Sequence, residues 1–120
     1  MDKNLIPIKE LQEGASVENV FVSNEDTYGG AHDYHFKKCL GWDKEKGESK
    51  FIDETATISF VRKEESGMVA GIQSEQLIVC LIDRHRKLDA KFPCDENKEF
   101  IRCLEEALEW QKSRIPQSFF

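Results

Sequence analysis

The chain has 120 residues, of which 39% are hydrophobic and 33% charged, and its formal net charge is −6. This length fits one domain covering residues 1–120, and eight Phe, two Trp and two Tyr argue against a disordered chain. The acidic balance argues against binding to DNA or RNA polymers, which requires clustered cations, and leaves a small anionic ligand open.

Residues 16–72 are predicted to form an antiparallel meander of strands and turns. Val17 and residues 20–22 form a short β-type run, which ends at the turn-forming residues 23–26. Gly29 and Gly30 mark a tight bend.

The next strands follow from alternation of apolar and polar residues. Residues 32–37 place His32, Tyr34 and Phe36 on one face. Residues 43–50 are polar and are predicted to form an exposed turn. Residues 57–62 alternate again, and a turn over residues 64–67 leads into a short strand over residues 68–72.

From Ser74 the apolar period becomes helical, with Ser74 as the predicted N-cap and Glu75 in the first turn. The apolar stripe of this helix consists of Leu77, Ile78, Leu81, Ile82, His85 and Leu88. Pro93 disfavours helical geometry at the residue before it, so this helix is expected to end near residues 91–92.

Asp95 is predicted to cap a second helix that runs to residues 115–116. Its apolar stripe consists of Phe100, Ile101, Leu104, Ala107 and Leu108. A connection of about three residues makes the pair, over residues 74–114, an antiparallel hairpin. The predicted fold class is therefore α+β, with an N-terminal antiparallel β-sheet followed by a C-terminal two-helix hairpin.

Residues 1–4 do not begin a basic region followed by an apolar run, so we expect no signal peptide. The apolar stretch over residues 77–82 is too short to cross a bilayer. We therefore expect a cytoplasmic protein without a membrane partner, in which the four cysteines are reduced thiols: Cys39, Cys80, Cys94 and Cys103.

Motifs for catalysis are not found in the sequence, and we expect neither an enzyme nor a cofactor. Gly29 and Gly30 could form a phosphate-binding turn, although a bend between strands is the simpler interpretation. A zinc site is a further alternative, since His32, His35 and Cys39 lie close together and Cys80 or Cys94 could complete four ligands. His32 and His35 would leave a flat strand on opposite faces, however, so we expect no metal.

Cations line the helical hairpin. Arg84, Lys87 and Lys91 fall along one flank of the first apolar stripe, whereas Arg86 is expected to point away from it. On the second helix, Arg102 is expected on the side away from the hairpin core.

A guanidinium clamps phosphate with two hydrogen bonds, and an aromatic ring stacks on a base. The residues available for such a nucleotide pocket are Arg62, Arg84, Arg102 and Arg114, with Phe92. Solvated or glutamate-paired arginines are the plainer alternative. The outer side of the hairpin, including Val79, Cys80, Arg102 and residues 119–120, is also a candidate surface for self-association.

Four segments in order resemble the first family of phage Thoeris anti-defence proteins: residues 28–32 (YGGAH), 39–42 (CLGW), 71–77 (GIQSEQL) and 83–93 (DRHRKLDAKFP). The resemblance runs from about Thr27 to Arg114. It implies a sponge that binds a cyclic ADP-ribose isomer, 1''-3' glyco-cyclic ADP-ribose, in the infected bacterial cytoplasm and holds it uncleaved. It also leaves cyclic di- or trinucleotides open as ligands.

The resemblance further implies a helical hairpin shared with anti-CBASS sponges, and assembly as a dimer or a trimer of dimers. Its ligand contacts are matched here by Phe92, Asn97 and Arg102, and Arg62 and Arg114 are candidate cations for a second ligand. The alternative that remains is a protein-interaction module that binds a host or phage polypeptide through the hairpin.

Overall fold

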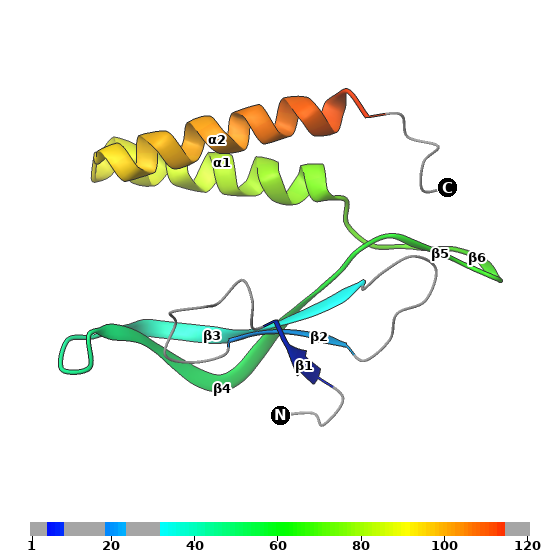
Figure 1. Cartoon of the computed structure of the whole chain (residues 1–120), viewed down its shortest axis with the longest axis horizontal. Helices are drawn as coiled ribbons and strands as arrows, with labels where there is room; N and C mark the ends of the chain where they lie inside the picture. Colours follow the sequence, from blue (N-terminus) through cyan, green and yellow to red (C-terminus); the bar gives the residue numbers. More distant parts are fainter. Residues whose placement is uncertain (1–4, 9–18, 24–31, 115–120) are drawn as a thin grey trace. The chain divides into compact units, whose positions relative to one another are not determined.

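The computed structural model describes residues 5–8, 19–23 and 32–114, and the chain divides into two compact units, Met1–Val69 and Ala70–Phe120. The fold is α+β, as predicted: an antiparallel sheet precedes a helical hairpin (Figure 1). The division between the units lies close to the predicted change from sheet to hairpin. That residues 1–120 form a single domain stays a prediction.

The sheet of the first unit has four strands in the order β1-β2-β3-β4, and all neighbours are antiparallel. The strands are β1 (Leu5–Pro7), β2 (Val20–Ser23), β3 (Asp33–Asp43) and β4 (Glu48–Ser59). The predicted meander is confirmed, but it begins before residue 16, since β1 belongs to it. The expected roles of Val17, Gly29 and Gly30 lie outside the described residues.

The turn between β3 and β4 is shorter than predicted. Asp43 closes it with its Oδ1, which accepts the backbone N–H groups of Glu45 at 3.0 Å and Lys46 at 3.2 Å. Gly47 adopts a positive φ of 66°, a left-handed conformation that favours glycine. Residues 48–50, which we expected in the turn, are the start of β4 instead.

The pairing of β3 with β4 is irregular near the middle of both strands. Lys37 lies opposite Thr55 and Cys39 opposite Phe51, so the register of the two strands shifts between these pairs. A salt bridge of 2.6 Å from Lys38 Nζ to Glu54 Oε1 crosses this irregularity. Such a bulge bends the strand and increases its local twist.

The predicted strand over residues 57–62 is wrong as a continuous element. β4 ends at Ser59, and β5 (Arg62–Glu64) pairs with β6 (Gly67–Val69) in a separate hairpin, shorter than the strand expected over residues 68–72. Phe60 N–H donates to His32 O at 2.8 Å, one residue before β3 begins at Asp33. Beyond Phe60 the chain pairs with itself instead.

The hairpin consists of α1 (Ser74–Lys91) and α2 (Asp95–Lys112) (Figure 1). Both predicted N-caps are one residue late. Gln73 caps α1, where its backbone N–H donates to Gln76 Oε1 at 2.8 Å, and Cys94 caps α2 by accepting the Asn97 N–H on its Sγ at 3.4 Å. α1 ends at Lys91 as predicted, whereas α2 ends at Lys112 rather than at residues 115–116.

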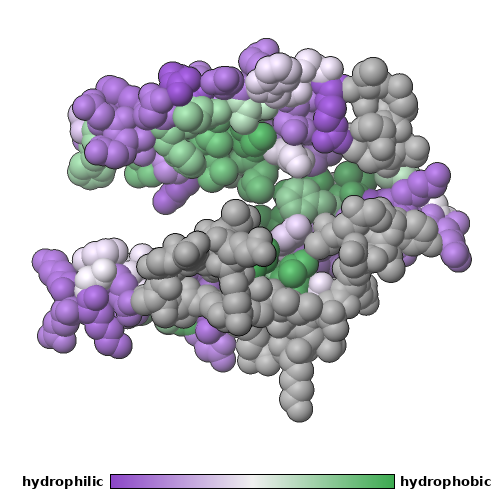
Figure 2. All heavy atoms as spheres, viewed as in Figure 1, coloured by the Kyte–Doolittle hydropathy of each residue, from purple (hydrophilic) through white to green (hydrophobic). Residues whose placement is uncertain are grey.

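The two helices pack through the predicted apolar stripes. Ile82 and Ile101 are the buried hydrophobic residues of the hairpin, 6% and 9% exposed, and a hydrophobic band bordered by hydrophilic residues runs along it in Figure 2. Arg86, which we expected to point away from the apolar stripe of α1, reaches α2 instead: its Nη2 donates to Glu105 Oε2 at 2.5 Å. Arg86 lies four residues after Ile82 and therefore shares its side of the helix.

Candidate anion-binding site on the helical hairpin

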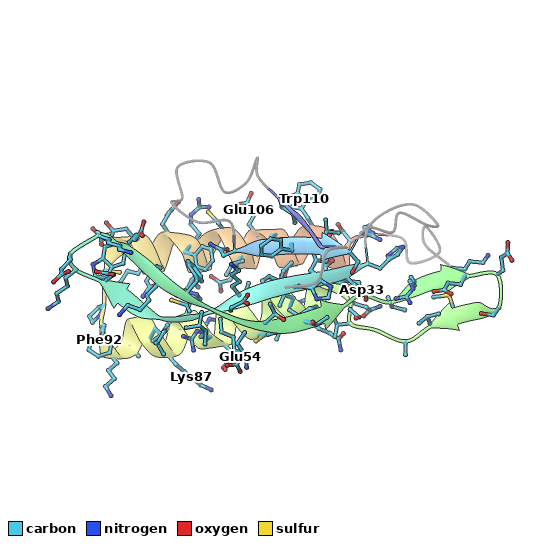
Figure 3. The ribbon with its side chains drawn as sticks, turned by 90° about the horizontal axis from the view of Figure 1, so that it is seen from below. Asp33, Glu54, Lys87, Phe92, Glu106 and Trp110 are labelled. Atoms are coloured by element: carbon cyan, nitrogen blue, oxygen red, sulfur yellow. The ribbon has the colours of Figure 1, made fainter. Side chains whose placement is uncertain are left out.

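A shallow groove of about 570 Å³ runs along α1 and is lined by Cys80, Asp83, Arg84, Lys87, Leu88 and Lys91. The helical repeat of 3.6 residues places these positions on the side of α1 opposite Ile82, and therefore away from α2. In Figure 3, Lys87 extends from α1 on this side, and Phe92 follows at the end of the helix. The predicted row of Arg84, Lys87 and Lys91 thus borders one groove.

The three cations of this row differ in their partners. Lys87 Nζ lies 2.8 Å from Asp83 Oδ2, and this hydrogen bond, followed by the attraction between the charges, raises the pKa of Lys87. Arg84 and Lys91 form no ion pair with any described residue. Lys91 Nζ instead lies 5.8 Å from the ring centre of Phe92, within the range of a cation–π contact.

Phe92 presents an open aromatic face at the end of this groove. It is the C-cap of α1, and its backbone N–H donates to Leu88 O at 2.7 Å. The residue is 65% exposed. Because Phe92 is fixed through its backbone while its ring remains in solvent, the ring can stack on a planar group without rearrangement of the helix.

Asn97 lies in the first turn of α2, where His85 of α1 reaches it. The distance from His85 Nδ1 to Asn97 Oδ1 is 3.2 Å, and the His85 ring meets Phe100 edge to face at 4.6 Å. With Oδ1 accepting from His85, the amide NH₂ group of Asn97 remains as a donor. The sequence placed His85 on the apolar stripe, but spacing alone did not predict this contact across the hairpin.

Arg102 lies on the outer side of α2, as predicted, and not in the groove. Its Nη2 lies 2.6 Å from Glu99 Oε1 and its Nη1 lies 3.2 Å from Glu106 Oε2. Glu106 and Trp110, on the same helix, extend away from α1 in Figure 3. The side-chain hydrogen bond between Arg102 and Glu99, followed by the attraction between their charges, raises the pKa of Arg102 and lowers the pKa of Glu99.

This ion pair yields a direct prediction. Arg102→Gln should raise the pKa of Glu99 back toward the ordinary glutamate value of about 4.3, because the cation that favours the charged carboxylate is removed. In the unmodified chain, the stabilisation by this pair is present above the ordinary pKa and is lost as the pH falls through the lowered one. A pH titration of the Glu99 side-chain carbon by NMR measures the shift. Lys112→Gln is the control, and an equal shift there would contradict the assignment.

The other two candidate arginines lie elsewhere. Arg62 belongs to β5 in the first unit, where its Nε lies 2.6 Å from Glu64 Oε2 and its Nη1 lies 3.8 Å from Asp33 Oδ1. Arg114 follows α2, and its Nη1 donates to Gln111 Oε1 at 3.4 Å. The structure therefore places Arg84 and Lys91 on one groove, with Phe92 next to Lys91, and it joins Asn97 to His85.

The zinc alternative loses one of its ligands. His35 Nε2 lies 2.9 Å from Ser23 Oγ, and His35 Nδ1 lies 2.9 Å from Thr57 Oγ1, so both ring nitrogens are engaged. Over the described ranges, no group of three or more His, Cys, Asp or Glu side chains could hold a metal ion. The four cysteines, all exposed, are free thiols.

No helix in the described part of the chain is long and apolar enough to span a bilayer. Comparison of the chain with protein-family models and with curated proteins finds no match.

Proposed function

We propose that this chain is a phage anti-defence sponge. It binds a cyclic ADP-ribose-type signal made by TIR-domain enzymes of Thoeris immunity, 1''-3' glyco-cyclic ADP-ribose, and holds it uncleaved in the cytoplasm of the infected bacterium. Cyclic di- or trinucleotides of CBASS immunity are further candidate ligands. The protein acts as a dimer or a trimer of dimers and performs no reaction on its ligand.

The observation that carries this proposal is the exposed ring of Phe92, with Lys91 beside it, at the end of a groove edged by cations. A nucleotide offers a planar base for the ring and phosphate oxygens for the cations, so both kinds of group are used. Sequestration requires complementarity to the ground state of the ligand, and an aromatic ring with cations offers it to the base and the phosphates.

The test is a thermal-shift screen of the purified protein against cyclic ADP-ribose isomers and cyclic di- and trinucleotides, followed by heating and chromatography of the bound ligand. A ligand that binds only the folded state raises the melting temperature. We expect stabilisation by 1''-3' glyco-cyclic ADP-ribose, and recovery of the ligand intact. No stabilisation by any of these compounds overturns the proposal, and recovery of a cleaved product overturns sequestration.

A second candidate function is supported by the outer side of α2. Trp110 is 72% exposed there, and large exposed aromatic side chains are typical of protein interfaces. A protein-interaction module would use this side of the hairpin to bind a host or phage polypeptide. Such a module gains no thermal stability from cyclic nucleotides, so the same screen distinguishes the two functions.

A further inference from the structure

Most of the described Lys and Arg side chains on the hairpin helices form ion pairs, and the few without one lie close together. Among the described residues, five of the seven Lys and Arg side chains on α1 and α2 form ion pairs: Arg86, Lys87, Lys98, Arg102 and Lys112. The two that do not are Arg84 and Lys91, and both line the groove on the outer side of α1. The unpaired positive charge of the hairpin is therefore collected in one place.

This arrangement leaves like charges close together. Lys87 is three residues after Arg84 and four residues before Lys91, and these are the spacings at which side chains meet on a helix surface. Like charges at these spacings destabilise a helix. Asp83 offsets one of them through its ion pair with Lys87, so three cations against one carboxylate leave a net charge of +2 in a chain whose net charge is −6.

We propose that the α1 groove is a subsite for a pyrophosphate group, held by Arg84 and Lys91 with Lys87 between them. The identity of the whole ligand rests on the function proposed above, whereas the subsite requires only a diphosphate anion. Arg84 supplies a planar guanidinium that can form two hydrogen bonds to one phosphate, and Lys91 supplies a mobile ammonium for the other.

The dimensions of the helix agree with this assignment. Arg84 and Lys91 are separated by two turns, about 10 Å along the axis, and Lys87 lies between them on the same side of α1. Cys80 and Leu88 add less polar surface to the groove. Beyond Lys91 the chain continues to the exposed Phe92, whose ring centre lies 5.8 Å from Lys91 Nζ.

The test uses the full chain and inorganic pyrophosphate without magnesium, titrated by isothermal calorimetry at low ionic strength. We expect saturable binding by the unmodified chain. The affinity should be at least about tenfold weaker in the double variant Arg84→Gln/Lys91→Gln, because loss of one charge-assisted hydrogen bond lowers the affinity by about tenfold. The matched control is Lys98→Gln/Lys112→Gln, which changes the net charge equally but removes cations that already have carboxylate partners. The control is expected to bind within twofold of the unmodified chain.

Absence of saturable pyrophosphate binding overturns the subsite. Equal weakening of pyrophosphate binding in the control variant also overturns it, because binding would then respond to net charge alone. Circular dichroism of both double variants verifies that the helices are retained. A parallel titration with 1''-3' glyco-cyclic ADP-ribose separates the two proposals. Pyrophosphate binding without binding of 1''-3' glyco-cyclic ADP-ribose or of any cyclic di- or trinucleotide overturns the proposed function and retains the subsite. If the Arg84→Gln/Lys91→Gln variant binds the cyclic nucleotide as tightly as the unmodified chain does, the subsite is overturned and the function is retained.

Discussion

Replacement of Ile101 by Ala is expected to lower the free energy of unfolding by about 2–4 kcal/mol, the usual cost of truncating a buried isoleucine. Ile101 is 9% exposed, and together with Ile82 it forms the buried part of the hairpin. A small core has few other contacts to compensate for the lost methyl and methylene groups. Urea denaturation followed by circular dichroism at 222 nm, where the helices dominate the signal, measures the loss.

Val79→Ala is the control for this experiment. Val79 lies on α1 but is 51% exposed, so its truncation is expected to cost less than about 1 kcal/mol. Equal losses in the two variants would show that Ile101 does not contribute more to the stability of the hairpin than a surface residue.

Replacement of Phe92 by Ala is expected to weaken binding of the proposed cyclic nucleotide by about 5- to 150-fold. This range corresponds to the loss of about 1–3 kcal/mol of stacking on one base. The fold should remain intact, because Phe92 is 65% exposed and caps α1 through its backbone. Calorimetric titration measures the affinity, and the melting temperature verifies the fold.

Two variants make this prediction specific. Phe92→Tyr keeps an aromatic ring and is expected to restore most of the affinity, whereas Trp110→Ala removes the exposed ring on the outer side of α2 and should leave binding unchanged. Unaltered binding by the Phe92→Ala variant would remove this residue from the site. Arg102→Ala is expected to leave binding nearly unchanged, because Arg102 lies on the outer side of α2, outside the groove, and is paired with Glu99 and Glu106.

The helices were easier to predict from the sequence than the strands. The apolar repeat from Leu77 to Leu88 and the proline at position 93 determine where α1 runs and ends, and a short connection forces an antiparallel pair. The caps were missed by one residue because Ser74 and Asp95 are common capping residues, whereas Gln73 and Cys94 fill these roles here. The start of β4 has no alternation of apolar and polar residues, so the pattern that predicts a strand is missing there. The side chains of β4 are exposed or half-buried.

The candidate site could be predicted only in part. The row of Arg84, Lys87 and Lys91 follows directly from the helical repeat, and so does the pairing of Arg102 with Glu99 and Glu106. The contact of His85 with Asn97 depends on how the two helices pack against each other. The apolar repeat of a single helix does not predict this packing. The position of Arg86 could have been found, because a residue four positions after Ile82 shares its face.

The irregular pairing of β3 with β4 has a consequence for how the chain behaves at high concentration. β4 is at the edge of the four-stranded sheet, and a straight edge strand is a template on which another chain can add by hydrogen bonding. The shift in register between Lys37 and Cys39 of β3 disrupts the regular spacing of such a template, and the Lys38–Glu54 salt bridge places charged groups there. We expect this irregular stretch of β4 to suppress aggregation by strand addition.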